Sequence, residues 1–357
     1  MDEPTPRLFR VAVLGANGQV GTELCLYLKV MGFCEPIAIT RSSNSTALLS
    51  RAGINCRSGD LANPQIAAKL LNDCDLIFDL ALPNGKNLTE TKRMVRARTT
   101  SIFSVTRPSK GFVLASTTSV YRFSAALPFF RAYRSMKLFS ERLSQSLGLK
   151  YRVPVYVFRL GQVHGELQSC SDSLKQGLSR NTGAIHVPDQ PSNAIFVFSI
   201  AEAIRAVLFE RTTPNIYTLI SHPAWSFADL VEWYAGKLGL NATVVVENVR
   251  PTSPIRQGFS AVSNWVKQGL SGVVGHYKEL LSAIVSKYSE QLDQKLRFAR
   301  TRKIAASTIN AYFDSLLYRP FEALNEIPGT RFPFASDSRA TMKKVEQGVE
   351  ELIRHVF

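Results

Sequence analysis

A tyrosine and a lysine four residues apart are the side chains in this sequence best suited to move a proton. Tyr133 and Lys137 stand in the stretch Tyr-Arg-Ser-Met-Lys, and the residues that follow, to Leu143, continue a helical pattern. Positions i and i+4 share one helix face, so the phenol and the ammonium are expected to be neighbours. A free tyrosine has a pKa of about 10, and a nearby ammonium lowers the pKa by favouring the phenolate. The pair is therefore predicted to give or take a proton near neutral pH.

A cluster of hydroxyl side chains precedes this pair. The apolar residues 112–115 predict a strand, and Ser116, Thr117, Thr118 and Ser119 follow it directly. Ligands bind beyond the carboxyl ends of the strands in open parallel sheets. The hydroxyl cluster is therefore expected beside the same ligand as the Tyr133–Lys137 pair, although a threonine there could also serve only to satisfy a loop carbonyl.

A glycine-rich loop near the start of the chain predicts a site for a dinucleotide. Residues 9–14 read as a buried strand, residues 22–30 as a helix, and Gly-Ala-Asn-Gly-Gln-Val-Gly joins them. Gly15 would permit the tight turn, Gly18 the approach of a pyrophosphate, and Gly21 the packing of helix on strand. The helix N-terminus would then attract the phosphates. The loop residues predicted to contact the cofactor are Gly15, Asn17, Gly18, Gln19, Val20 and Gly21.

The next predicted strand favours NADP(H) over NAD(H). It covers residues 36–40, and Arg41 and Ser42 follow it where an acidic residue would bind the ribose hydroxyls of NAD. Arg41 can pair with a 2′-phosphate, and Ser42 can donate a hydrogen bond to it. The alternative is that Arg41 is an ordinary surface arginine.

These motifs, in this order, resemble the extended short-chain dehydrogenase/reductase family, also described as the NAD-dependent epimerase/dehydratase family. The G-x-x-G-x-x-G spacing, the hydroxyl strand, Tyr-x-x-x-Lys and the element from Arg159 to Gly165 carry the resemblance, which covers about residues 8–245 and 327–357. It implies that Tyr133 exchanges the proton that matches a nicotinamide hydride transfer. It also implies that Thr117 orients the substrate oxygen and that Lys137 holds the nicotinamide ribose.

The resemblance adds cofactor contacts outside the glycine loop. Asp60 and Leu61 are expected near the adenine, and Ala81 and Leu82 beside a cofactor ribose. An asparagine that supports a proton relay in many family members has no counterpart in residues 92–106.

The expected fold class is α/β, with a doubly wound parallel Rossmann sheet and a smaller, mostly helical C-terminal substrate domain. We expect residues 1–165, with returning segments at about 193–222, to form the NAD(P)-binding domain. Residues 166–192 and 223–357 would form the substrate domain. Within it, apolar residues at three- and four-residue steps predict an amphipathic helical insertion at about 256–325.

The insertion allows several partners. Residues 250–303 hold ten Lys and Arg against three Asp and Glu. The helices could pack on their own domain or on a second subunit, which makes a homodimer the expected assembly. They could instead dock an acidic carrier protein or, through residues 256–320, lie at a membrane surface.

Composition narrows the remaining classes of function. The formal net charge of +15 favours anionic partners, including an anionic small-molecule substrate. No nucleic-acid recognition motif accompanies the charge, so no nucleic acid is expected. The five cysteines show no CxxC spacing, so no metal site is expected. The lack of a long apolar run and of a signal-like N-terminus favours a cytoplasmic protein, with membrane-surface association as an alternative.

Three functions follow from these observations. The leading hypothesis is an NAD(P)-dependent epimerase or reductase of a nucleotide sugar. The second is an NADPH-dependent ketoreductase acting on a lipid or carrier-bound acyl substrate, which Arg41 and the amphipathic insertion favour. The third is a cofactor-binding scaffold without catalysis. The complete set of Tyr133, Lys137 and Thr117 argues against it, because a scaffold does not need all three side chains.

Overall fold

The computed structural model describes residues 7–42, 46–83, 85–121, 128–180, 184–189, 191–247, 329–334 and 339–356. The chain divides into two compact units. The first comprises Met1–Asp172, Pro191–Trp225 and Leu324–Phe357, and the second comprises Ser173–Gln190 and Ser226–Ala323. The predicted insertion at 256–325 lies outside the described residues, so the partners expected for it stay predictions.

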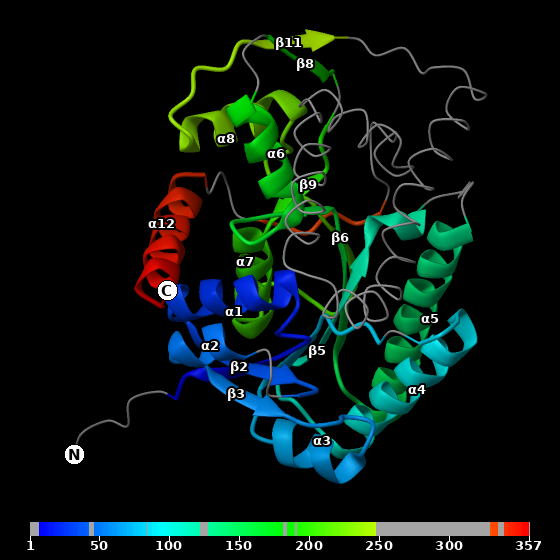
Figure 1. The fold of residues 1–357 in the computed structure, drawn as a ribbon. Helices are drawn as coiled ribbons and strands as arrows, with labels where there is room; N and C mark the ends of the chain where they lie inside the picture. Colours follow the sequence, from blue (N-terminus) through cyan, green and yellow to red (C-terminus); the bar gives the residue numbers. More distant parts are fainter. Residues whose placement is uncertain are drawn as a thin grey trace, which may run out of the picture. The chain divides into compact units, whose positions relative to one another are not determined.

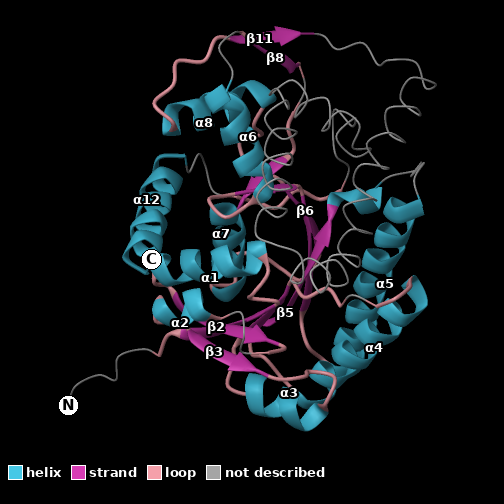
Figure 2. Ribbon diagram, viewed as in Figure 1, coloured by secondary structure: helices cyan, strands magenta, loops and turns pink. Residues whose placement is uncertain are grey.

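A seven-stranded parallel sheet forms the centre of the first unit (Figure 2). Its order is β10-β6-β5-β4-β1-β2-β3, so β1 lies between β2 and β4 and the order reverses there. Ligands bind in the crevice at such a reversal in doubly wound sheets. The predicted Rossmann fold class is confirmed. The strands are β1 (Phe9–Leu14), β2 (Cys34–Thr40), β3 (Asn55–Ser58), β4 (Leu76–Asp79), β5 (Gly111–Thr117), β6 (Val155–Leu160) and β10 (Ile216–Leu219).

Helices cover both faces of this sheet (Figure 1). On one face lie α3 (Pro64–Leu71), α4 (Leu88–Val105) and α5 (Pro128–Tyr151), and side chains such as Leu70, Phe103 and Leu147 pack there against Ile77 and Leu114 of the strands. On the other face α1 (Gln19–Met31), α7 (Val197–Leu208) and α12 (Arg339–Val356) contact one another. The short helix α2 (Ala47–Arg51) precedes β3, and a 3-10 turn (Thr118–Tyr121) follows β5. The inner strands are buried because both faces of the sheet are covered, whereas the edge strand β3 is partly exposed.

The element from Arg159 to Gly165 that carries the family resemblance is divided at Gly161. The Gly161 amide donates to Leu219 in the central sheet, whereas the next amide, of Gln162, donates to Asn193. A Cβ on Gly161 would collide with the Asn193 carbonyl oxygen. The chain thus leaves the central sheet at Gly161, and β7 (Gln162–His164) pairs instead with β9 (Ala194–Phe196).

The chain's last helix belongs to the first unit. The sequence placed this segment in the substrate domain, but α12 packs on α1, where a Cβ on Gly348 would lie 2.9 Å from Val30 Cγ1. Just before α12, Thr330 accepts a hydrogen bond from the Thr218 amide, and Phe332 donates one to the Thr218 carbonyl. Residues 330–332 therefore cover the edge strand β10.

The second unit is described in part. It contains α8 (Phe227–Lys237) and a parallel pair formed by β8 (Ile185–Pro188) and β11 (Val244–Glu247), and α6 (Ser169–Arg180) leads into it from the first unit. Ser226 and Asp229 form a capping box at the start of α8. Among the helices in the described part of the chain, none has the length and apolar character to span a membrane.

Candidate functional site

The glycine loop between β1 and α1 leaves little room for side chains at Gly15 and Gly21. Gly15 has a φ of +78°, which disfavours any side chain, and a Cβ there would lie 3.0 Å from the Ala81 backbone. A Cβ on Gly21 would collide with the Gly15 carbonyl oxygen, so a side chain would push α1 away from the loop. The Gly18 amide closes the turn by donating to the Gly15 carbonyl at 3.0 Å.

The start of α1 suits a phosphate. Gly18 is the N-cap, no side chain caps the helix, and its first turn holds no acidic residue. The first-turn residues Gln19, Val20 and Gly21 line a cavity. Backbone amides and the positive end of a helix dipole make such a turn attractive to anions. These residues fit the pyrophosphate of a dinucleotide.

A cavity of about 700 Å³ lies beyond the carboxyl ends of β1 to β4. Its charged lining residues are Arg41, Asp60, Arg93 and Arg98, so cations outnumber the single carboxylate. The Thr40 hydroxyl fixes the Arg41 loop by donating to the Ser42 carbonyl at 2.9 Å. The residues predicted for cofactor binding that line this cavity are Gly15, Asn17, Gly18, Arg41, Ser42, Asp60, Leu61, Ala81 and Leu82.

A second cavity, of about 360 Å³, contains the predicted catalytic residues. Thr117 enters it from the end of β5, and Tyr133 and Lys137 enter it from α5. The two cavities share Gly15, Gly18, Leu80 and Leu82 as lining residues. The structure therefore brings every predicted site residue to two adjoining cavities along the switch-point edge of the sheet.

Lys137 is buried, and neighbouring groups stabilise its ammonium charge only in part. The side chain is 9% exposed, and the ammonium donates to the Ala115 carbonyl oxygen at 2.9 Å. Burial lowers the pKa of Lys137 to about 8. The Asp79 and Glu141 carboxylates each act to raise this pKa, and the Arg98 guanidinium acts to lower it further. The lysine can therefore change charge in the physiological pH range.

The expected depression of the Tyr133 pKa does not appear in this structure. Burial raises the pKa of the phenol, and a hydrogen bond with Thr117 opposes that rise. The Lys137 ammonium lies 5.8 Å from the centre of the Tyr133 ring and is bound to Ala115. Helical spacing places the two side chains on one face but contains no information on the burial of the phenol, and burial dominates the pKa.

Comparison with known proteins assigns the family. The model of the NAD dependent epimerase/dehydratase family matches residues 11–208, which is more than half of the chain. The chain belongs to the NAD dependent epimerase/dehydratase family. It is accordingly an enzyme of the extended short-chain dehydrogenase/reductase type that depends on a pyridine nucleotide. No curated protein matches the chain.

Solved structures agree with this epimerase/dehydratase fold. UDP-N-acetylglucosamine 4-epimerase from Bacillus cereus is 18% identical, with a TM-score of 0.51, over 67% of this chain and 85% of that one. UDP-glucuronic acid 4-epimerase from Bacillus cereus, in complex with NAD, is also 18% identical, with a TM-score of 0.50, over 67% and 87% of the two chains. At this identity the likeness concerns the fold.

Two buried ion pairs beside the site of this epimerase/dehydratase family member were missed by the sequence analysis. Asp79 pairs with Arg98 at 2.6 Å, and Glu141 pairs with Arg159 at 2.7 Å. Asp79 carried a usable signal, because it is a lone carboxylate in the apolar run from Leu76 to Leu82. A buried carboxylate requires a partner, so a cation on a facing helix could have been expected.

His164 illustrates a residue near the site with a packing role. It is fully buried, and its ring lies 5.8 Å from that of Phe196. The structure therefore favours packing over catalysis for this side chain.

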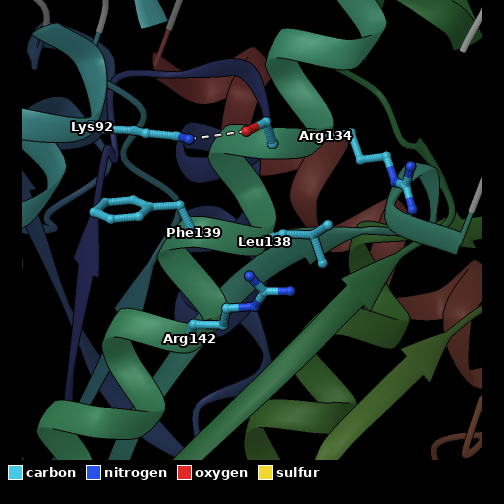
Figure 3. Close-up of a pocket in the computed structure, with 6 residues that line it drawn as sticks. Lys92, Arg134, Leu138, Phe139 and Arg142 are labelled. Atoms are coloured by element: carbon cyan, nitrogen blue, oxygen red, sulfur yellow. Dashed lines mark hydrogen bonds between the residues drawn. The ribbon is translucent and has the colours of Figure 1, made fainter. Parts of the chain in front are cut away.

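A third cavity, of about 330 Å³, lies on α4 and α5 away from the predicted site residues (Figure 3). The Lys92 ammonium donates to the Ser135 hydroxyl at 2.9 Å and lies over the Phe139 ring. Arg96 also lies over that ring, 5.2 Å from its centre. These contacts join α4 to α5, so the cavity marks a seam between the helices that carry Arg98 and Lys137. Its lining residues are Lys92, Arg134, Ser135, Leu138, Phe139 and Arg142.

Proposed function

We propose that this protein is an NAD(P)-dependent epimerase or reductase of a nucleotide sugar. The observation that carries the proposal is the meeting of Thr117, Tyr133 and Lys137 in one cavity with the glycine loop. The substrate class comes from the UDP-sugar epimerases with which the chain shares its fold, and the net charge of +15 suits an anionic substrate.

Each of the three side chains has a distinct task in this proposal. When bound, the nicotinamide accepts or returns a hydride at the sugar carbon. Tyr133 moves the matching proton at the sugar oxygen, and Thr117 hydrogen-bonds that oxygen and holds it toward the phenol. Lys137 is held by the Ala115 carbonyl, from where its remaining N–H groups can bind the cofactor ribose and its charge can support a phenolate.

A pair of phenylalanine variants tests the role of Tyr133. Tyr133→Phe removes the proton-bearing oxygen while keeping the ring, so turnover should fall by about 10²–10⁴-fold and NAD(P)H affinity should stay within about twofold. Tyr151→Phe, at the other end of the same helix, is the matched control and should keep normal turnover. Near-normal turnover of Tyr133→Phe would overturn the assignment.

Cofactor consumption separates an epimerase from a reductase. The purified enzyme is mixed with NADPH or NADH and a panel of UDP- and dTDP-sugars, and the absorbance at the nicotinamide band is followed while sugars are analysed by chromatography. An epimerase interconverts sugars without net loss of absorbance, whereas a reductase consumes the cofactor. Neither change with any nucleotide sugar, together with NADPH oxidation by a carrier-bound or lipid ketone, would favour the ketoreductase alternative.

The preference for NADP(H) is part of the proposal. Arg41 and Ser42 line the larger cavity at the end of β2, and Arg93 lines it from α4. These side chains supply the positive charge that a 2′-phosphate requires. Arg41→Ala should weaken NADPH binding at least tenfold and leave NADH binding nearly unchanged, as measured by fluorescence titration. Equal weakening of both would contradict a 2′-phosphate contact.

A further inference from the structure

The Asp79–Arg98 pair forms a closed set of contacts at the end of β4. Asp79 is 2% exposed and ends the strand. The Arg98 Nη2 lies 2.6 Å from one Asp79 oxygen, and the other oxygen accepts the Ala81 amide at 3.0 Å. Arg98 Nη1 completes the set by donating to the Ala81 carbonyl at 2.9 Å. Both backbone polar groups of Ala81 are therefore held by the pair.

Ala81 lines the larger cavity, so the Asp79–Arg98 pair fixes the position of one wall of that cavity. Ala81 lies between Leu80 and Leu82 in this lining. Its backbone is in close contact with the glycine loop, since a Cβ on Gly15 would lie 3.0 Å from Ala81 Cα. A shift of Ala81 would change the space between β4 and the loop, and with it the space for a dinucleotide.

The pair also lies beside Lys137. Asp79 is the register partner of Leu114 on β5, and the Lys137 ammonium binds the carbonyl of the next residue, Ala115. Partners on adjacent strands are about 4.8 Å apart. Arg98 comes from α4, which packs against the helix α5 that carries Lys137, and the Asp79 carboxylate and the Arg98 guanidinium both act electrostatically on the Lys137 ammonium.

The charges around Lys137 come from three elements. Asp79 faces it from β4, Arg98 from α4 and Glu141 from its own helix, α5. Glu141 is held independently: Arg159 of β6 binds both its oxygens, and the Ser116 hydroxyl of β5 donates to it. Asp79 and Arg98 act on the ammonium with opposite sign, so each can be altered without disturbing the Glu141 network.

We propose that the Asp79–Arg98 ion pair is a positioning unit that balances the charge at Lys137 and fixes the cavity wall at Ala81. This role of the ion pair rests on the proposed function only because Lys137 takes part in catalysis in that function. The electrostatic part can be measured without any substrate.

Two neutralising variants give opposite expectations. Asp79→Asn keeps an oxygen for the Ala81 amide but leaves Arg98 as an unbalanced cation, which disfavours the Lys137 ammonium. Arg98→Met leaves Asp79 as an unbalanced anion, which favours it. The Lys137 titration midpoint should therefore fall by about one pH unit in Asp79→Asn and rise by about one in Arg98→Met. The double variant should return close to the wild-type midpoint.

The measurement is a carbon-13 NMR titration of lysine Cε in the full-length protein, with the Lys137 signal assigned by its loss in Lys137→Arg. Midpoints that move in the same direction in both single variants, or in neither, would overturn the charge-balancing role. Arg98→Lys keeps the charge without the forked geometry, and it remains informative if Arg98→Met fails to fold. It should leave the midpoint near that of wild type while weakening NADPH binding several-fold, and unchanged binding would overturn the role at Ala81.

The outcome is separable from the proposed function. If Tyr133→Phe keeps full turnover, the assignment of Tyr133 fails, yet opposite movements of the Lys137 midpoint would still establish the charge balance. Conversely, an inactive Tyr133→Phe with an unmoved Lys137 midpoint keeps the proposed function and removes the role of the pair.

Discussion

The Lys137 ammonium hydrogen-bonds the Ala115 carbonyl at 2.9 Å, two residues before Thr117 at the end of the same strand. One strand end thus anchors the lysine by its backbone and presents the threonine by its side chain. Helix α5 supplies Tyr133 one turn before Lys137. This contact ties the strand end that carries Thr117 to the helix that carries Tyr133 and Lys137.

Lys137 should impose an alkaline limit on turnover. Its pKa is lowered to about 8, and the proposed role requires the ammonium, so turnover should decline as the pH rises through about 8. Lys137→Met should lower kcat by about 10²-fold or more at pH 7. Lys150→Met, at the exposed end of the same helix, serves as the control. A rate independent of pH between 7 and 9.5 would contradict the requirement for a charged Lys137.

The same lysine should make stability depend on pH. The folded-state pKa of about 8 lies below the model value of 10.5, so the unfolded chain binds more protons between these values. Stability should therefore rise with pH across that window. Urea unfolding at pH 7.5 and pH 9.5 should show wild type gaining free energy of unfolding relative to Lys137→Met. A constant difference between the two proteins would show that Lys137 titrates alike in both states.

Glu23 should produce the opposite trend at lower pH. It is fully buried on α1, and its oxygens accept hydrogen bonds from the Glu166 and Leu167 amides and from Gln168. Burial raises its pKa from 4.5 to about 7. Its contribution to stability is therefore lost as the pH rises from about 4.5 to about 7. Unfolding of wild type and Glu23→Gln at pH 5 and pH 7.5 tests this, with Glu232→Gln as the exposed control. An equal difference at both pH values would argue against titration of Glu23.

A methyl group on the glycine loop should impair cofactor binding. Gly21→Ala places a Cβ against the Gly15 carbonyl oxygen, so NADPH affinity should fall at least tenfold. The free energy of unfolding should also drop by about 1–3 kcal/mol. Gly236→Ala is the matched control, since a Cβ there has no neighbour within 4 Å and the residue is helical. Wild-type NADPH affinity in Gly21→Ala, measured by fluorescence titration, would show that the loop can accommodate the added methyl group.

The seam between α4 and α5 should depend on Phe139. Its ring lies under Lys92 (Figure 3) and also under Arg96, and Phe139→Ala should lower the free energy of unfolding by about 1–3 kcal/mol. Leu149→Ala on the same helix is the control, because Leu149 is 85% exposed and should change stability by less than about 0.5 kcal/mol. Equal effects of the two variants in urea titrations would contradict a structural role for the seam.

Local signals predicted much of this architecture. The glycine loop, the order of the apolar strands and the Tyr133–Lys137 spacing were enough for the fold class, because each reflects a short-range constraint. Asp79, Arg98 and Glu141 escaped notice because their roles depend on partners that only the sheet register and helix packing bring together. The pKa direction of Tyr133 was misjudged for a related reason, since spacing along a helix contains no measure of burial. The division at Gly161 likewise follows from a distant carbonyl, that of Asn193.

The packing of α12 on α1 has a consequence for synthesis of the chain. The buried side chains of α12, Met342, Glu346 and Val349, complete the face of a unit whose first strand begins at Phe9. Phe9 leaves the ribosome long before residue 342 does. The face of α1 on which α12 packs therefore stays uncovered while the second unit is synthesised. The nascent cofactor-binding unit is thus exposed to misassembly for most of translation, and an early-bound dinucleotide would stabilise it during that interval.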